Sequence, residues 1–273
     1  MSSHWVGDGF PVNTMLSYST MGASISPFLL LDYAGPANFE PSNLQRGVGM
    51  HPHRGFETVT IVYSGEVEHK DNAGNAGKIG PGDVQWMTAA RGILHEERHS
   101  KAFSQQGGLL EMIQLWVNLP AKDKMSPPHY QEILNAQIPV VALPDQAGSA
   151  RIIAGQFGDT VGAARTFTPI NLWDVHLNAG SEVQLPSPER FNTALLVLKG
   201  SVNINGSQHL HGKELALFGP TGDHVNLKAD EDSILLMMNG EPINESIAGH
   251  GPFVMNTQEE INKAINDFNG GRF

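Results

Sequence analysis

The chain contains no cysteine among its 273 residues. This absence excludes disulfide bonds, thiolate catalysis and cysteine-based metal sites, and it is typical of a reducing compartment, so we expect a cytoplasmic location. Long apolar runs are missing as well, because no stretch reaches the roughly 18 residues that span a bilayer. The opening segment, MSSHWVGDGF, has neither a basic stretch nor an apolar core. We therefore expect neither a signal peptide nor a membrane segment.

Charge is sparse and mostly negative. Charged residues make up 16% of the chain, and the formal net charge is −11. Because a phosphate backbone requires a basic surface, and no Lys/Arg cluster reaches the size of a binding patch, we expect no direct nucleic-acid binding. The chain instead has 30 Gly, 17 Pro and 40% hydrophobic residues. Many turns around a sizeable core favour an all-β fold.

An internal repeat indicates two domains. The stretch MHPHRGFETVTIVYSGEV (50–67) aligns without a gap with LPSPERFNTALLVLKGSV (185–202), at an offset of 135 residues. Each copy is a β-rich run that leads into a Gly and then a second strand. The sequence therefore predicts two similar β-domains, residues 1–134 and residues 151–273, joined by a connecting segment at 135–150.

The repeat fails at three polar positions of the first copy. His51 aligns with Pro186, His53 with Pro188 and Glu57 with Asn192. If these side chains served only the fold, the second copy would be expected to need them too. We infer that the scaffold is duplicated while the chemistry belongs to the first half.

The ligand-type residues of the first half are spaced for two strands. Residues i and i+2 of a strand point to the same face, so His51 and His53 can aim into one cavity, and Glu57 shares their parity. His95 and Glu97 repeat this spacing further along. Three imidazoles and one carboxylate suit a divalent Fe, Mn, Co, Ni, Cu or Zn ion. Four protein ligands on an octahedral ion would leave two positions open for a substrate or O₂.

The segment HEERH at 95–99 also matches the HExxH pattern of zinc proteases. That mechanism needs both histidines on one face of a helix. The segment follows ARGIL, and no helical apolar stripe runs through it. We therefore expect a strand, with Glu96 and Arg98 facing away from the site.

Several motifs together resemble one family. The pattern HxHx₃E before a β-strand, and PGD at 81–83 before a later His, resemble the two cupin motifs. The stretches HWVGDGFPV, SPFLLLDYAGP, GPGDVQWMTAARGILHEE, LWVNLPAKDKMSPPHYQ and GPFVMNTQEEI are similar to the pirin family over nearly the full length. The resemblance implies two tandem cupin (jelly-roll) barrels packed face to face, with metal only in the N-terminal barrel.

The resemblance also implies residue roles. The metal ligands of the family fall on His51, His53, His95 and Glu97. Glu57 would then orient a ligand imidazole through its other ring nitrogen. In the second half His224 and Asn226 resemble the second ligand pair. Without a first pair they could not close a site.

Pirins are similar to quercetin 2,3-dioxygenases, which cleave a flavonol with O₂ and release carbon monoxide. The resemblance implies Fe(II) first among the possible metals, with Glu97 as general base and Glu57 as runner-up. Two other interpretations remain open: an iron-binding regulatory protein that acts on a protein partner, and a metal-free structural bicupin. We expect a monomer, because two barrels in one chain already form the pair that single-domain cupins make by dimerising.

The end of the chain predicts a short helix. Thr257 and Glu260 have the spacing of a capping box. An apolar stripe at helical spacing follows, formed by Ile261, Ala264, Ile265 and Phe268, and Gly270 and Gly271 provide a stop. We expect this stripe to pack against a barrel.

Overall fold

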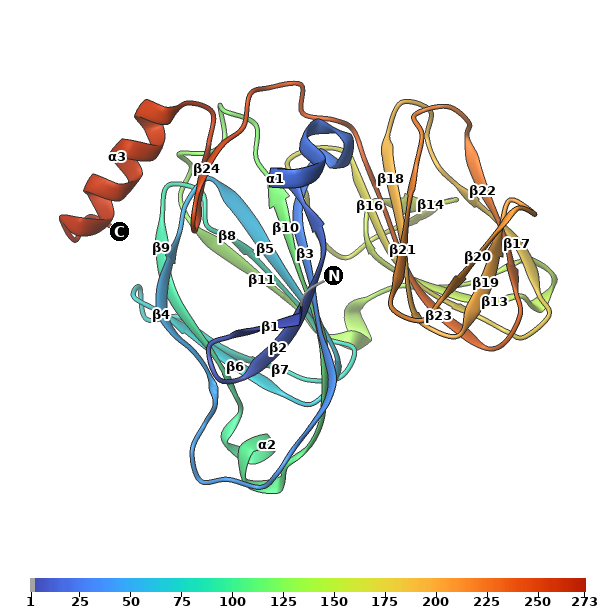
Figure 1. The fold of residues 1–273 in the computed structure, drawn as a ribbon, viewed down its shortest axis with the longest axis horizontal. Helices are drawn as coiled ribbons and strands as arrows, with labels where there is room; N and C mark the ends of the chain where they lie inside the picture. The colour runs from blue at the N-terminus through green and yellow to red at the C-terminus, as the bar shows by residue number, and fades with distance from the viewer. Residues whose placement is uncertain (1–2) are drawn as a thin grey trace. The chain divides into compact units, whose positions relative to one another are not determined.

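The protein is described by a computed structural model that covers residues 3–273. It is built mainly of β-strands, with a short helix near the C-terminus, so the all-β prediction is confirmed (Figure 1). The chain forms two compact units. The first unit comprises residues 3–22, Phe28–Asn135 and Ile243–Phe273, and the second comprises Ala23–Pro27 and Ala136–Pro242.

Two facing sheets make up the barrel of the first unit. The larger sheet has the strand order β1 (Ser3–Val6), β2 (Phe10–Ser17), β3 (Phe28–Phe39), β10 (Gly108–Asn118), β5 (Phe56–Ser64), β8 (Val84–Thr88) and β11 (His129–Ile133). The smaller sheet has the order β4 (Gly47–His53), β9 (Ile93–His99), β6 (Val67–Asp71) and β7 (Ala76–Ile79). Short helices α1 (Tyr18–Met21) and α2 (Lys101–Gln106) lie between strands.

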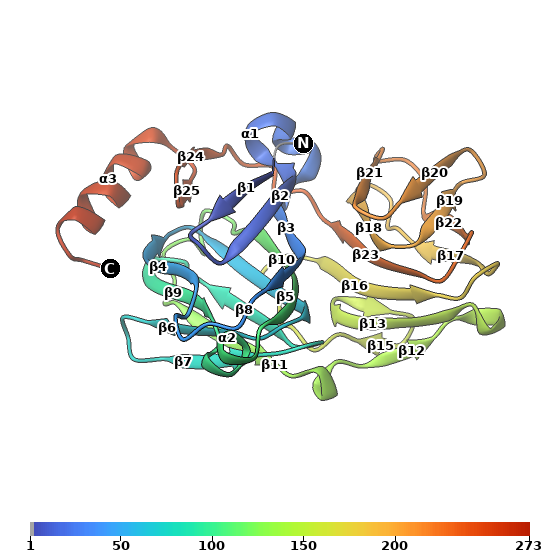
Figure 2. The ribbon, with the colours of Figure 1, turned by 60° about the horizontal axis from the view of Figure 1, so that its bottom comes forward.

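The second unit repeats this plan (Figure 2). Its larger sheet has the order β12 (Val140–Ala142), β13 (Gly148–Ala154), β16 (Ile170–Leu177), β23 (Ser233–Gly240), β18 (Asn192–Lys199) and β21 (Glu214–Phe218). Its smaller sheet has the order β17 (Glu182–Pro186), β22 (His224–Ala229), β19 (Ser201–Ile204) and β20 (Gln208–His211). A two-stranded ribbon of β14 (Gln156–Phe157) and β15 (Thr160–Val161) completes the unit.

The repeated sequence occupies matching strands of the two units. The first copy runs through β5 into β6, and the second runs through β18 into β19. Gly65 and Gly200 join these strand pairs, and both have φ +85°. An L-residue with a side chain rarely adopts that conformation, so glycine is required at both turns. The same local pattern therefore produces the same hairpin twice.

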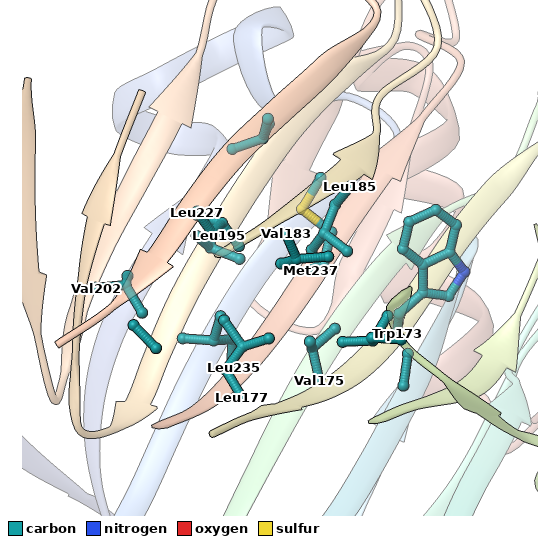
Figure 3. Packing of buried hydrophobic residues seen from close by; sticks show 14 of the residues in the cluster. Trp173, Val175, Leu177, Val183, Leu185, Leu195, Val202, Leu227, Leu235 and Met237 are labelled. Atoms are coloured by element: carbon teal, nitrogen blue, oxygen red, sulfur yellow. The ribbon is translucent and has the colours of Figure 1, made fainter. Parts of the chain in front are cut away.

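Alternating burial explains the strands of the second unit. In β22, for example, residues alternate strictly between exposed and buried. The inward residues join one apolar core that fills the barrel (Figure 3). The core includes Trp173, Leu185, Leu195, Leu227 and Met237, each at most 2% exposed. Burial of apolar surface stabilises such a core by about 25 cal/mol per Å².

The last part of the chain belongs to the first unit. The sequence division grouped residues 151–273, whereas the structure assigns Ile243–Phe273 to the unit that contains β4 and β9. The reason is the pairing of residues 248–255. The hairpin β24 (Ala248–His250) and β25 (Phe253–Met255) exchanges backbone hydrogen bonds with Arg54, whose N–H reaches Pro252 O and whose carbonyl accepts from Val254 N. Local sequence pattern carries no signal for such a return.

The segment predicted as a connection is partly structured. Residues 135–150 contain two 3₁₀ turns, Asn135–Gln137 and Pro144–Gln146, and strand β12, which pairs with β13. Most of this segment is therefore part of the second barrel.

Helix α3 (Gln258–Asn269) forms where the capping box predicted it. The Thr257 hydroxyl accepts from Glu260 N, and the Glu260 carboxylate accepts from Thr257 N. Ile261 and Ala264 are buried against Phe253 and Met255. Within residues 3–273, none of the helices has the length and apolar character that crossing a membrane requires.

Candidate metal centre

Strands β4 and β9 bring three histidines together. His51 and His95 are direct cross-strand partners, and His53 lies two residues beyond His51 on the same strand. One ring nitrogen from each histidine lies within 4.8 Å of the others. A β-bulge between Val48 and His51 adds one residue to β4 and turns the following side chains into the barrel. The spacing of two strands therefore produces one cluster.

The histidine rings are prepared to act as neutral ligands. Burial lowers the pKa of His53 well below its usual value, and the neighbouring His95 and His51 rings lower it further. Burial also lowers the pKa of His95, with smaller contributions from His51 and His69. A neutral imidazole has the lone pair that a metal requires.

Hydrogen bonding around the cluster fits a metal. The Nδ1–H of His51 donates to Gly49 O at 2.8 Å, which leaves Nε2 as the free lone pair. Among residues 3–273, His53 Nδ1 and both ring nitrogens of His95 are buried without a hydrogen-bond partner. Buried polar atoms normally have partners, and a divalent ion bound between the rings would give one nitrogen of each ring a partner.

Glu97 lies two residues after His95, on the same face of β9, and is 4% exposed. The group of three histidines does not include its carboxylate. Instead, Glu97 Oε2 accepts from Gln114 Nε2 at 3.0 Å, and Glu97 Oε1 accepts from Thr60 Oγ1 at 3.4 Å. These two donors come from the opposite sheet and hold the carboxylate inside the barrel.

Glu57 has a different environment from the one expected. Because side chains alternate along β5, Glu57 and Thr60 point to opposite faces, and Thr60 is the one that contacts Glu97. Glu57 Oε1 accepts from Thr88 Oγ1 at 2.7 Å. Burial raises the pKa of Glu57 to about 7. Glu57 therefore lies on the face of the sheet opposite to the one that contacts Glu97.

The structure excludes the protease interpretation of HEERH, because residues 93–99 form strand β9. Glu96 faces outward, as expected, and pairs with Lys70 and Arg98. His99 is buried, but its Nε2–H donates to Gly9 O at 2.9 Å. Its ring also packs against Phe39 at 4.6 Å between ring centroids, so it serves the core.

Sequence reasoning missed the polar row that crosses the larger sheet of the first unit. The row consists of cross-strand partners on five neighbouring strands: Thr14, Asp32, Gln114, Thr60 and Gln85. Two of its members are the donors to Glu97. The strands are distant in sequence, so no motif could have revealed the row.

Sequence reasoning also left His69 aside. His69 is the cross-strand partner of Glu97, is 5% exposed, and has its ring stacked near Tyr130. Its spacing of two from the buried Val67 could have indicated an inward side chain.

Aromatic side chains enclose the cluster on one side. The rings of Phe56 and Trp116 lie 5.1 Å and 5.5 Å from the His53 ring, measured between centroids. They also pack on each other at 4.3 Å. This apolar wall limits water around His53.

The matching positions of the second unit cannot hold a metal. In sequence, His224 and Asn226 resemble the pair His95 and Glu97, but both of these side chains are exposed. At the repeat offset of 135 residues, Val48 corresponds to Val183. Val48 is the cross-strand partner of Glu97, and Val183 is the cross-strand partner of Leu227. The bulge in β4 then shifts the correspondence, so His95 and Glu97 match the buried Val225 and Leu227.

Two family models match the chain. The model described as Pirin covers residues 9–117, and the model described as Pirin C-terminal cupin domain covers residues 172–273. A Pseudomonas aeruginosa protein named "Putative quercetin 2,3-dioxygenase" is 57% identical over 270 residues, which is 99% of this chain and 94% of that protein. A pirin-like protein of Caulobacter vibrioides is 40% identical, over 90% of this chain and 87% of that protein.

Solved structures show the same fold. The crystal structure of a quercetin 2,3-dioxygenase from Acinetobacter baumannii has a TM-score of 0.97 and 53% identity, covering 100% of this chain and 95% of that one. The pirin YhhW of Escherichia coli, solved in complex with nickel(II), has a TM-score of 0.69 at 21% identity, covering 88% and 95%. The chain belongs to the pirin family.

Proposed function

We propose that the protein is a metal-dependent dioxygenase that cleaves a flavonol such as quercetin with O₂ across the 2,3-bond and releases carbon monoxide. The observation that carries this proposal is the cluster of three imidazoles in the first barrel, two of them buried and neutral. The names of similar proteins from Pseudomonas aeruginosa and Acinetobacter baumannii support it.

In this proposal His51, His53 and His95 hold one divalent ion, and Glu97 completes the ligand set. Fe(II) is the metal that we propose, although imidazole and carboxylate also suit Ni, Mn, Co, Cu and Zn. When bound, the ion would supply Lewis acidity that lowers the pKa of the flavonol hydroxyl, with open positions for small ligands.

The residues of the chain then have distinct tasks. Glu97 accepts the phenolic proton as general base, with its carboxylate held by Gln114 and Thr60. Phe56 and Trp116 keep water from His53 and offer an apolar wall to a flat substrate. A flavonol and O₂ are the proposed small-molecule partners. A regulatory protein partner, the monomeric state and the cytoplasmic location remain predictions from the sequence.

Oxygen uptake tests the proposal. Protein loaded anaerobically with Fe(II) is expected to consume O₂ on addition of quercetin, with loss of the flavonol absorbance, while metal-free protein does not. Glu97→Gln should lose most of this activity. Glu96→Gln, which alters the outward neighbour, should keep it. If protein that holds one metal consumes no O₂, the activity is contradicted and the regulatory interpretation takes its place. If Glu97→Gln stays fully active, Glu97 is not the base.

A further inference from the structure

A cavity of the first unit is lined by several positively charged side chains, although the protein as a whole is acidic. It has a volume of about 610 Å³ and lies beside helix α3, and none of the four proposed metal ligands lines it. Four positively charged side chains line it: Arg54, Arg91, Lys263 and Arg272. The whole chain has 17 Lys and Arg against 28 Asp and Glu. The cationic lining therefore runs against the overall charge.

The two acidic residues at this cavity are already occupied. The Asp71 carboxylate accepts from Ala73 N at 2.9 Å, from Asn75 N at 2.8 Å and from Asn75 Nδ2 at 2.7 Å. Asp267 accepts from Arg54 Nη1 at 2.8 Å and from Arg272 Nε at 2.9 Å. Four cations thus face two carboxylates, and both carboxylates have partners.

Two exposed cations of the lining, Arg91 and Lys263, have no ion-pair partner among the described residues. Their charges are available to a ligand, and the low-dielectric walls of a cavity strengthen their attraction for an anion.

Arg54 adds a buried donor. Its side chain is 4% exposed, and its guanidinium lies 4.2 Å from the centroid of the Phe273 ring. Its Nε is buried, and no described residue accepts a hydrogen bond from it. A buried donor without a partner is costly, and a planar carboxylate is the acceptor that a guanidinium recognises best.

The remaining lining suits a flat ring. Phe273, Tyr130, Pro127, Pro128 and Met125 present aromatic or apolar surfaces to the cavity. We propose that this cavity binds a small aromatic carboxylate, with the carboxylate held by Arg54, Arg91 and Lys263. None of the four proposed metal ligands lines the site, and the proposal does not depend on the proposed oxygenase activity.

Calorimetric titration with 4-hydroxybenzoate tests the site, with 4-hydroxybenzamide as its neutral isostere. The titrations use the full chain, both metal-loaded and metal-free. The amide should bind at least tenfold more weakly than the carboxylate. The double variant Arg91→Gln/Lys263→Gln should also lose at least tenfold in affinity, and its thermal unfolding should be unchanged because both side chains are exposed.

A matched control removes two exposed cations elsewhere, as Lys122→Gln/Arg190→Gln. It should bind 4-hydroxybenzoate within twofold of the wild type. Equal weakening in this control would mean that only the net charge matters, and would overturn the site.

Three further outcomes would also overturn the proposal: undetectable binding to the wild type, equal binding of the amide, and binding that disappears with the metal while the Arg91/Lys263 variant is unaffected. Inorganic phosphate that binds as tightly as 4-hydroxybenzoate would contradict the aromatic part, because the cations would then accept any anion. Tight binding of 4-hydroxybenzoate together with weak binding of phosphate supports the proposal.

Discussion

The two barrels share a backbone plan but differ in what fills them. Matching strands follow the same order in both larger sheets and in both smaller sheets. In the first barrel the polar row faces inward, with Thr60 and Gln114 bound to Glu97. In the second barrel the matching cross-strand partners are Ile152, Trp173, Met237, Leu195 and Ala216. An apolar core occupies the place of a polar site.

The comparison separates what makes the fold from what makes the site. Alternating strands and the turns at Gly65 and Gly200 are common to both barrels, so they build the scaffold. The first barrel buries histidines and a carboxylate, which is costly without partners or an ion. The second barrel avoids that cost by burying Val225 and Leu227 at the matching positions. Interior side chains, not topology, therefore determine which barrel can bind a metal.

The largest expected effect comes from removing a histidine of the first barrel, which should abolish the difference in metal binding between the two barrels. Loss of a residue that only orients a ligand reduces metal affinity about 10–100-fold, so His53→Ala should reduce it more than about 100-fold. The rise in melting temperature that a divalent metal gives the wild type should then disappear. Differential scanning fluorimetry with and without metal measures it. His209→Ala, an exposed histidine of the second barrel, is the control and should keep the rise.

A polar substitution in the second barrel should show that its apolar core does not accommodate the polar side chains of a binding site. Met237 is fully buried in the apolar core of the second barrel. The equivalent position in the first barrel is occupied by Gln114. Met237→Gln would bury an amide without partners and should lower the free energy of unfolding by about 3 kcal/mol. Denaturant unfolding measures this change. The exposed Met125→Gln should change it by less than about 0.5 kcal/mol. Equal effects would refute the contrast between the two interiors.

Glu57, which aligns with Asn192 in the repeat, should make the stability of the first barrel depend on pH. Burial raises its pKa from 4.5 to about 7, so the folded state binds this proton more tightly than the unfolded state. The contribution of this carboxyl to stability should therefore fall as the pH rises from about 4.5 to above 7, by about 3 kcal/mol in total. Glu57→Gln keeps the bond from Thr88 and should lack this fall. Unfolding curves at pH 4 and pH 8 decide it, and parallel pH dependence in both proteins would contradict the raised pKa.

The smallest expected effect comes from replacing one residue of the polar row with the apolar residue found at the equivalent position of the second barrel. Gln114→Met removes one donor to Glu97 and should weaken metal binding about tenfold with the fold retained. Competitive metal titration measures the affinity. Gln184→Met, an exposed change on β17, should leave it unchanged. Unchanged affinity in Gln114→Met would show that Glu97 does not need this bond, or is not a ligand.

Local patterns predicted a large part of the fold. The β-rich run before Gly65 and the capping box at Thr257 are complete within a few residues, so the strand and the helix could be read directly. The spacing of two residues between His51 and His53 predicted for the same reason that both side chains face one side of a strand. These features depend on neighbours in the sequence.

Other features depend on long-range pairing and could not be predicted. Gln114 meets Glu97 only because β10 pairs with β5 across the barrel from β9. The bulge before His51 shifts the correspondence between the repeats, so His224 and Asn226 resemble the second ligand pair in sequence although both side chains are exposed. The return of residues 243–273 to the first unit is likewise a tertiary contact.

Metal content per chain, combined with anomalous diffraction at the absorption edge of the metal, tests the central claim most directly. The wild type and His224→Ala should each hold one ion, located between His51, His53 and His95, and His95→Ala should hold none. A second ion in the barrel that contains His224, or an ion retained by His95→Ala, would contradict the assignment of the chemistry to one barrel.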